Sequence, residues 1–413
     1  MRETVLLSIL ILVGWTACTQ KTRNTQSTSE TDSNIKQELP IPALDVNGVY
    51  PQKEVVAQNL GNIRYIRLET QSKALLGDKM SPTISKDGFF FYGFSSGDIV
   101  GFDLDGKLLT NFNHKGQGAN EYTNIQKVAF DKENGEIFVL TQGKSPSILA
   151  YDTEGEPLYS YSIPDTLSAW NIVSLNKKAL LIWDMKNTPP LLNGKLAFTW
   201  EERPAPNPCP YVILNKKDGS IISRLPLSIK GRFRHFIMTR VDGYSYVYIA
   251  QHNSLTPYMD GFILNEYNSD TTFWIDKGQT IKPIFTRTPS VHSDLLKGKL
   301  CEVLALTDSY ACIRTISLNT EEAKPGVGLK EHILLIDRKE GNIAECIFRD
   351  ENFKGKDGIL PRPISSNNKL YFMLYPHVLK DAETNHSLSG ELETLTQSLK
   401  DDDNPVLIEL SVD

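Results

Sequence analysis

The segment Gly116-Gln117-Gly118-Ala119-Asn120-Glu121-Tyr122 opens the stretch of sequence that decides the fold. Three runs of strand-forming residues follow it, then a turn and a fourth run: Ile125–Phe130, Glu136–Leu140, Ser147–Tyr151, Asp152–Gly155 and Pro157–Ile163. Four short strands in meander order, separated by turn residues, are typical of one blade of a β-propeller. The rest of the chain repeats this pattern imperfectly, which predicts an array of such blades.

The repeat aligns on an outer hairpin, in which a strand ends in an aromatic or aliphatic residue, then Asp or Asn, then a turn usually closed by Gly. Gly accepts a positive φ, and Asp or Asn side chains bond nearby backbone amides. The instances are Phe102–Gly106, Tyr151–Gly155, Leu214–Gly219, the degenerate Leu264–Asp270, and Ile336–Gly341. Each follows a β-rich run, and these runs are Phe89–Phe94, Ile137–Leu140, Leu180–Trp183, Tyr244–Ala250 and Tyr310–Ile316.

A sixth unit contains only three strand-like runs, Ile359–Ser365, Lys369–Tyr375 and Val406–Val412. The alternating run Ile63–Leu68 has no partner of its own, so we predict that it completes the last blade. Such closure hides two sheet edges and joins the ring into one unit. The expected fold is therefore all-β, a six-bladed propeller of four-stranded antiparallel blades over residues 41–413.

Two inserts interrupt the repeat. Asn187–Pro210 is rich in Pro, which cannot lie in central strands. His377–Asp403 is predicted to be a helical insert, because Leu388, Leu392, Leu395 and Leu399 recur at helical spacing. This leucine stripe is expected to pack against the propeller, with a partner site as the alternative.

The N-terminus has the features of a processing segment. Val5–Trp15 is mostly apolar but, as a helix, would rise only about 16 Å, too short for a bilayer core of about 30 Å. Trp15-Thr16-Ala17-Cys18 is similar to the lipobox of bacterial lipoproteins, which implies a signal peptide over residues 1–17 and lipidation of Cys18. Plain secretion is the alternative. The polar residues 18–40 are expected to form a flexible tether.

Composition excludes some partners. The chain has 413 residues, 40% of them hydrophobic, and a formal net charge of −6. Lys and Arg are scattered among acids, so nothing suggests a nucleic-acid partner. Beyond Cys18 there are four cysteines, Cys209, Cys301, Cys312 and Cys346. An exported protein could pair them as disulfides, or they could be small buried apolar residues.

Three segments together resemble the six-bladed β-propeller lipoproteins of Bacteroidetes, sometimes described as TolB-like: Ile63–Thr70, Gly116–Tyr122 and Asp402–Ile408. The resemblance spans about Leu60 to Asp413. This chain has Ala119-Asn120 where the family motif has Pro-Gly. The resemblance implies the fold and a membrane-anchored location in the cell envelope. No acidic run follows Cys18, which favours the periplasmic side over the cell surface.

No convergent catalytic set is visible in the sequence. The histidines do not form a His-Glu-x-x-His pair, and no Gly-x-Ser-x-Gly turn or phosphate-binding loop occurs. Asp103-Leu104-Asp105-Gly106 is similar to the start of a calcium loop but lacks the downstream ligands, so a hairpin turn is the better interpretation. We predict no cofactor and no metal ligand, with calcium as the one ion to consider.

Most candidate ligand-binding residues lie in segments expected between blades, because propellers place sites on one face of the ring. These are Asn120, Glu121, Tyr122, Arg232, Arg234, His235 and His252, and Trp200 of the Pro-rich insert is added because aromatic side chains bind sugars by stacking. For each of them, turn stabilisation or ordinary surface exposure is the alternative role. Arg232 and Arg234 could bind carboxylates or anionic sugars, or form surface salt bridges.

These observations favour a non-enzymatic binding module that presents one propeller face to an envelope glycan, peptide or partner protein. A propeller-fold hydrolase or lyase with a metal in the central channel is the alternative, by analogy of fold alone. A structural assembly partner without a small ligand is a third interpretation.

Overall fold

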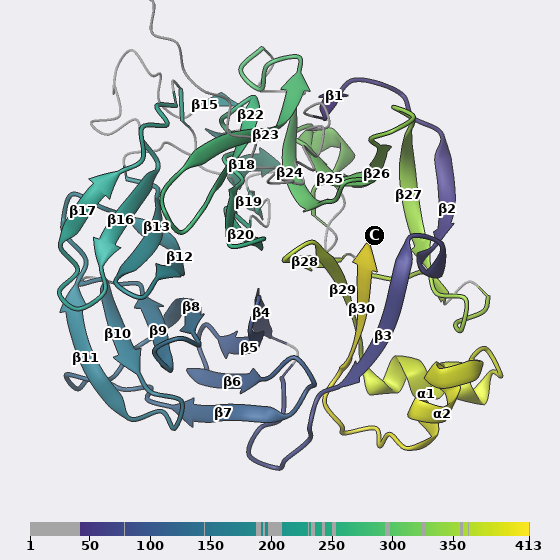
Figure 1. Ribbon diagram of the computed structural model, residues 1–413, viewed down its shortest axis with the longest axis horizontal. Coiled ribbons are helices and arrows are strands. Elements are labelled where there is room, and N and C mark those ends of the chain that lie inside the picture. The colour runs from purple at the N-terminus through teal and green to yellow at the C-terminus, as the bar shows by residue number, and fades with distance from the viewer. Residues whose placement is uncertain are drawn as a thin grey trace, which may run out of the picture. The chain divides into compact units, whose positions relative to one another are not determined.

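Six sheets of four or five strands stand around a common centre (Figure 1). The computed structural model describes residues 42–412 except 78, 144, 187–190, 193–194, 197–208, 230, 233–235, 242–243, 250–252, 294–297, 324–327, 356–357 and 362. For 191–192, 195–196, 236–241, 244–247 and 249 it describes the backbone alone. The fold is the predicted six-bladed β-propeller of antiparallel blades, with two helices near the C-terminus.

Each blade is a meander whose first strand lies nearest the centre. Blade 1 contains β4 (Met80–Ser85), β5 (Gly88–Gly93), β6 (Asp98–Phe102) and β7 (Leu108–Asn113). Blade 2 contains β8 (Ile125–Asp131), β9 (Glu136–Thr141), β10 (Ser147–Tyr151) and β11 (Pro157–Ser162). Blade 3 contains β12 (Ala169–Asn176), β13 (Ala179–Asp184), β16 (Tyr211–Asn215) and β17 (Ile221–Arg224). Blade 4 contains β20 (Leu255–Tyr258), β21 (Gly261–Leu264), β22 (Thr271–Ile275) and β23 (Ile281–Thr288). Blade 5 contains β24 (Lys299–Leu306), β25 (Tyr310–Ser317), β26 (Glu331–Asp337) and β27 (Ile343–Arg349). Blade 6 contains β28 (Ile364–Ser366), β29 (Lys369–Leu374), β30 (Val406–Val412) and β3 (Gly61–Arg67).

The second strands of the blades are mostly apolar. β5 and β13 are buried at every position, because both faces of each blade pack against a neighbouring blade. The outer turns that the repeat predicts are present in blades 1, 2, 3 and 5, between the third and fourth strands. In the turn after β6 the Asp103 carboxylate accepts hydrogen bonds from the amides of Asp105 and Lys107, both 2.9 Å. The Asp103 segment is therefore the hairpin turn that we expected.

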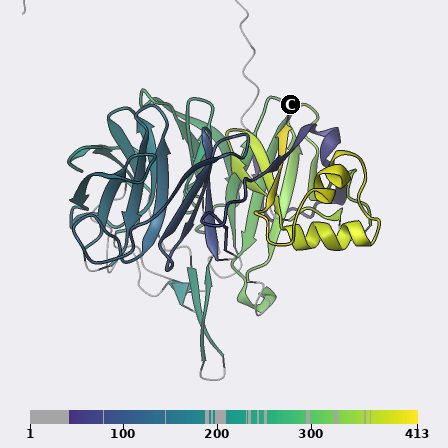
Figure 2. The same ribbon diagram turned by 90° about the horizontal axis from the view of Figure 1, so that it is seen from below.

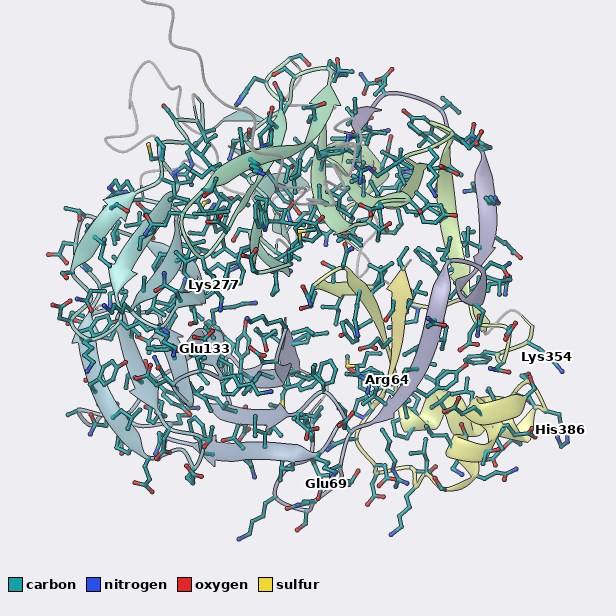
Figure 3. The ribbon with its side chains drawn as sticks, viewed as in Figure 1. Arg64, Glu69, Glu133, Lys277, Lys354 and His386 are labelled. Carbon is teal, nitrogen blue, oxygen red and sulfur yellow. The ribbon has the colours of Figure 1, made fainter. Side chains whose placement is uncertain are left out.

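The closure of the ring is also confirmed. β3 pairs antiparallel with β30, from Gly61 opposite Val412 to Arg67 opposite Val406. Arg64, labelled in Figure 3, lies on β3 with its guanidinium 3.3 Å from the Glu409 carboxylate of β30. An N-terminal strand thus completes a blade whose other three strands come from the end of the chain.

Two further N-terminal strands were not predicted. β1 (Ala43–Asp45) pairs parallel with β23 and β2 (Gln52–Val56) pairs parallel with β27, so each adds a fifth strand to the outside of blade 4 or blade 5. They cover the open outer edges of these two blades, which would otherwise expose unpaired backbone groups. Two short 3-10 helices, η1 (Ala57–Asn59) and η2 (Thr320–Glu322), lie in connections.

A seventh sheet lies outside the repeat. It contains β14 (Leu191–Leu192), β15 (Lys195–Leu196), β18 (Phe236–Val241) and β19 (Tyr244–Ile249), in the order β15-β14-β18-β19. Figure 2 shows its long hairpin extending away from the blades. The prediction that Tyr244–Ala250 is the strand before the fourth hairpin was therefore wrong. The prediction that Leu264–Asp270 is the outer hairpin of blade 4 was also wrong, because this segment joins β21 and β22, the second and third strands. The outer turn of blade 4 lies between β22 and β23, where the Asp276 carboxylate accepts from the amide of Thr280 at 2.8 Å.

The predicted helical insert consists of α1 (Pro376–Thr384) and α2 (Gly390–Gln397), between β29 and β30. Its leucines pack against blades 5 and 6: Leu388, Leu392 and Leu399 are 5%, 0% and 4% exposed and share a cluster with Phe348 and Phe372. The leucine stripe is thus a packing surface of the propeller, as expected.

Candidate functional site

The centre of the ring encloses a cavity of about 510 Å³. Its wall includes residues of β4, β8, β12, β20, β24 and β28, the first strands of the blades. Each of these strands is the last in its sheet, so one of its edges has no partner strand. The volume lies within the range of small-ligand sites, and the free strand edges supply hydrogen-bonding groups.

Five charged residues line the cavity within the described part of the chain, namely Lys86, Asp87, Lys127, Glu302 and Arg314. Arg314 lies 3.1 Å from Glu302 on the neighbouring strand, and the Tyr267 hydroxyl donates to the same carboxylate at 3.1 Å. Burial acts to lower the pKa of Arg314, but the neighbouring Tyr267, Glu302 and Glu331 outweigh it and raise that pKa. Arg314 is therefore a charge already compensated by protein groups.

Lys127 differs from Arg314 in its surroundings. It follows a β-bulge, since Ile125 pairs with Thr141 but Lys127 pairs with Leu140, and bulges redirect side chains. Its ammonium lies 6.0 Å from the centre of the Tyr92 ring. Burial lowers the pKa of Lys127 to about 8, and no charged neighbour offsets that effect.

The remaining wall of the cavity combines aromatic rings with hydroxyl groups. Tyr92, Phe94, Phe130 and Phe262 supply the rings. The Tyr92 hydroxyl donates to the carbonyl of Gln126 at 3.2 Å. Ser365 is 3% exposed, and its hydroxyl has no hydrogen-bond partner among the described residues. The wall can therefore contact a ligand that has both an apolar body and polar groups.

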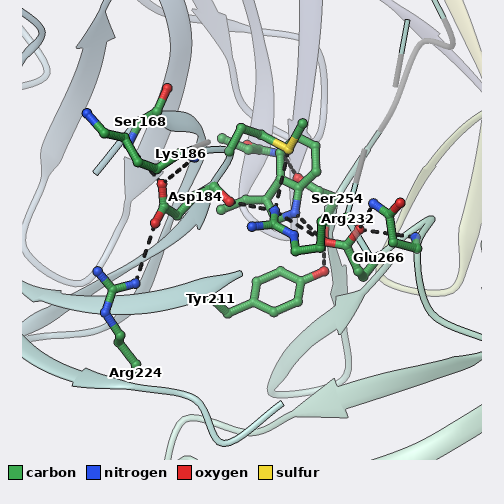
Figure 4. Close-up of polar contacts among 12 residues, drawn as sticks. Ser168, Asp184, Lys186, Tyr211, Arg224, Arg232, Ser254 and Glu266 are labelled. Carbon is green, nitrogen blue, oxygen red and sulfur yellow. Dashed lines mark hydrogen bonds and ion pairs between the residues drawn. The ribbon is translucent and has the colours of Figure 1, made fainter. Parts of the chain in front are cut away.

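The structure buries Arg232 completely, at the boundary of blades 3 and 4 (Figure 4). Its guanidinium donates to the carbonyl of Asp184 at 2.6 Å and lies 3.7 Å from the Glu266 carboxylate, which also accepts from the Trp183 indole at 2.9 Å. The Asp184 carboxylate accepts from the backbone amides of Ser168 at 2.8 Å and Lys186 at 2.9 Å. Arg232 thus joins two blades through protein groups.

The loop before β8 is held mainly by its own contacts. Asn120 and Glu121 are exposed, and the Glu121 carboxylate accepts from the amide of Gly118 at 2.8 Å. Tyr122 is 1% exposed, and its hydroxyl donates to the carbonyl of Gly97 at 2.8 Å. The Asn120 carbonyl accepts from the Tyr151 hydroxyl at 2.8 Å. These contacts suit the role of turn stabilisation.

The other candidate residues, Cys18, Trp200, Arg234, His235 and His252, lie outside the described residues. The described members do not meet, since Tyr122 contacts blades 1 and 2 and Arg232 contacts blades 3 and 4. Sequence reasoning missed Lys127, although a lysine inside the apolar run Ile125–Phe130 was a visible signal.

Other site types can be assessed only over the described ranges. There, no group of three or more His, Cys, Asp or Glu side chains could hold a metal ion. The four described cysteines, Cys209, Cys301, Cys312 and Cys346, form no disulfide, and burial raises the pKa of Cys301 and of Cys346 to about 11. In the same ranges, no helix has the length and apolar character needed to span a membrane.

Comparison with known proteins agrees with the fold. A crystal structure of a Bacteroides fragilis protein, described by its name as exported, covers 91% of this chain and all of its own at 13% identity, with a TM-score of 0.59. A DUF4221 family member from Bacteroides vulgatus covers 84% of this chain and 96% of its own at 9% identity and a TM-score of 0.43. Virginiamycin B lyase from Staphylococcus aureus covers 75% of this chain and 81% of its own at 13% identity, with a TM-score of 0.33. The identities are low, so these likenesses concern fold alone.

No curated protein matches the chain. A family model does, over residues 44–411, and its description is "Domain of unknown function (DUF4934)". The match extends from β1 to β30 and so includes every blade. The chain therefore belongs to the DUF4934 family.

Proposed function

We propose that this protein is a cell-envelope lipoprotein that binds a glycan, a peptide or a partner protein without transforming it. Residues 1–17 act as a signal peptide, and lipidated Cys18 anchors the propeller to a membrane, on the periplasmic side. The similar fold of a Bacteroides fragilis protein described as exported supports the location. The TolB-like resemblance of the three quoted segments supports the anchored state.

The observation that carries the binding role is the central cavity of about 510 Å³, lined by six free strand edges. Such a cavity receives ligand atoms without rearrangement of the blades, because each blade packs on two neighbours and the ring is closed by β3. Of its two described carboxylates, Glu302 is held by Arg314 and Tyr267. The geometry therefore favours recognition of a ligand over acid–base chemistry on it.

A thermal-shift screen of the purified chain would test this role. The panel compares EDTA, calcium and zinc with envelope glycans and peptides. A ligand at 100 times its dissociation constant adds about 2.7 kcal/mol of stability, an easily measured rise in Tm. A rise with a glycan or peptide that is unaffected by EDTA supports the binding module. A rise that requires metal favours the hydrolase or lyase instead, and turnover of a glycan by the purified chain would refute the proposal.

The lipid anchor has its own test. Cells that express the full chain or its Cys18→Ala variant are labelled with radioactive palmitate. Label on the wild-type chain and its loss in the variant support lipidation at Cys18. Absence of label from both chains, or release of the wild-type chain as soluble protein, favours plain secretion.

A further inference from the structure

The central cavity contains a half-buried cation, Lys127, without a carboxylate partner among the described residues. Arg314 contacts Glu302 at 3.1 Å and Glu331 at 3.7 Å, whereas the side chain of Lys86 is exposed to water. No hydrogen bond or ion pair joins Lys127 to any residue that the structure describes, and its ammonium lies near the Tyr92 ring. The described lining thus carries three cations and two carboxylates, a net charge of one positive unit, and Lys127 is its half-buried cation without an ion pair.

Lys127 is half-buried, and an ammonium that has lost part of its water without gaining a counter-charge is in an unfavourable state. The lowered pKa of Lys127 expresses this cost, yet a pKa of about 8 leaves most of the side chain protonated at neutral pH. An anion placed beside this ammonium would remove the cost. The free protein is therefore organised to gain more from an anionic ligand than from a neutral one of the same shape.

A second observation points to the same cavity. The Ser365 side chain lines it, is almost fully buried, and has a hydroxyl without a hydrogen-bond partner among the described residues. Buried hydroxyls are ordinarily satisfied, so this one is available to a ligand or to water. The rings of Tyr92, Phe94, Phe130 and Phe262 offer flat apolar surface in the same space.

We propose that the central cavity binds a small organic carboxylate, whose carboxylate group pairs with Lys127 and whose ring-shaped or apolar body lies against Tyr92 and its aromatic neighbours. One unpaired ammonium compensates one negative charge. A phosphate dianion would leave a charge uncompensated, because Arg314 already pairs with Glu302. The inference rests on the proposed binding function and names the ligand class of the same cavity.

Affinity should depend on pH in a defined direction. The ligand carboxylate is charged at all pH values above about 5, whereas Lys127 loses its charge as the pH rises past about 8. The other described groups of the lining that carry charge or titrate are Lys86, Asp87, Glu302, Arg314 and Tyr92. Tyr92 stays neutral in this range because burial raises its pKa to about 12. Affinity should therefore fall above pH 8.

Calorimetric titration of the purified full chain tests the proposal. The probes are two uronates, glucuronate and galacturonate, and two aryl carboxylates, benzoate and 4-hydroxyphenylacetate, each beside its neutral amide. We expect a carboxylate to bind at least ten-fold more tightly than its amide. Lys127→Gln should lose at least ten-fold in affinity and Lys127→Arg should keep most of it. Lys53→Gln, the same charge change at an exposed position of β2, should bind as wild type. Comparison of the uronates with the aryl carboxylates shows whether the cavity prefers a sugar ring or an aromatic ring beside the carboxylate group.

Absence of carboxylate binding, or equal affinity in wild type and Lys127→Gln, would overturn the assignment to Lys127. If a neutral glycan or peptide still binds, the proposed function stands and only the ligand class fails. If the wild-type chain binds nothing in either panel, the ligand class fails and the proposed function is reduced to binding of a partner protein.

A measurement without ligand checks the lysine itself. The pKa of Lys127 is lower in the folded chain than its ordinary value of 10.5, so the unfolded chain binds more protons between about pH 8 and pH 10.5. Wild-type stability should therefore rise over this interval relative to Lys127→Gln. If the free energy of unfolding changes equally with pH in wild type and in Lys127→Gln, the ammonium is solvated by water, and this result would also overturn the proposal.

Discussion

The backbone amide of Asn367 donates a 2.6 Å hydrogen bond to the carbonyl of Pro257. Asn367 lies in the turn between β28 and β29 of blade 6, and Pro257 lies in β20 of blade 4. The contact bypasses blade 5, which is attached to the same turn because the Asn368 side chain accepts from the amide of Leu306 at 2.8 Å. Three blades are thus joined beside the cavity, at the end where first and second strands meet.

This turn requires left-handed backbone, with φ of 48° at Asn367 and 68° at Asn368. We expect Asn367→Gly to unfold in urea like wild type, because Gly accepts this region and the contact with Pro257 uses only backbone. Asn367→Val should lose about 1–2 kcal/mol, since a β-branched side chain is strained there. Equal midpoints for the two variants would contradict the turn geometry.

The second prediction concerns a buried ion pair between blades. Lys216, after β16, pairs with Asp131 at the end of β8; their side chains are 2% and 6% exposed. Its ammonium also donates to Ser174 at 2.8 Å and lies 5.3 Å from the centre of the Phe138 ring. Lys216→Met should cost about 3–5 kcal/mol, because it leaves the Asp131 carboxylate buried without its cation.

A matched pair on the surface provides the control. Lys277 and Glu133, labelled in Figure 3, lie 2.6 Å apart but are 36% and 40% exposed. Lys277→Met should cost less than about 1 kcal/mol, since water solvates the remaining carboxylate. Adding Asp131→Leu to Lys216→Met should recover part of the loss. Similar losses at Lys216 and Lys277 in urea unfolding would refute the role of burial.

The third prediction compares two glycines with positive φ. Gly155 has φ of 87°, and a Cβ there would lie 2.7 Å from the Phe112 side chain of blade 1. Gly135 has φ of 65°, and a Cβ there would meet nothing within 4 Å. Both Ala variants bear the backbone strain, but Gly155→Ala should lose about 1–3 kcal/mol more because of overpacking. Equal Tm values for the two variants would exclude close packing of this turn on β7.

The fourth prediction concerns pH and the closing strand. Burial acts to raise the pKa of Glu409, but hydrogen bonds from Lys369, Tyr371 and Arg64 outweigh it, so the pKa lies below its ordinary value. A carboxyl with a lowered folded pKa contributes stability that is complete above its unfolded pKa of about 4.5 and lost as the pH falls through the folded value. Wild type should therefore lose more stability from pH 5 to pH 3 than Glu409→Gln. Glu156→Gln, at an exposed turn, should follow wild type.

The fifth prediction tests the strand added to blade 4. Leu44 of β1 is fully buried and packs in a cluster with Phe285 and Ile313. Leu44→Ala should cost about 2–5 kcal/mol, whereas Val49→Ala, at a side chain 98% exposed, should stay within about 0.5 kcal/mol of wild type. A Leu44→Ala variant as stable as wild type would show that β1 contributes little to the propeller.

Much of the fold could be predicted because its signals are local. Asp152 accepts hydrogen bonds from the amides of Glu154 and Glu156, two and four residues away, so the sequence of that hairpin contains its own reason for turning. The leucines of the helical insert likewise reveal their buried face by spacing alone. The placement of Tyr244–Ile249 was predicted wrongly, because the sequence of a strand with alternating residues is the same in a blade and in a separate hairpin.

The candidate site was less predictable, because its properties arise where distant residues meet. Arg232 looks like a surface cation in sequence, yet Asp184 and Glu266 surround it once blades 3 and 4 pack. Lys127 looks like a solvated strand residue, yet six strands place it in the central cavity. Burial and charge pairing depend on these long-range neighbours.

Turn chemistry and periodicity within a few residues predict the number of blades, the outer hairpins of blades 1, 2, 3 and 5, the closure by residues 63–68 and the packing role of the leucine stripe. Three features appear only in the folded ring: β1 and β2 cover blades 4 and 5, β14, β15, β18 and β19 form a separate sheet, and Lys127 enters the cavity wall without a carboxylate partner among the described residues. The physical reason is that strand edges and buried charges are satisfied by whichever groups the closed ring brings to them, however far apart these lie in the chain.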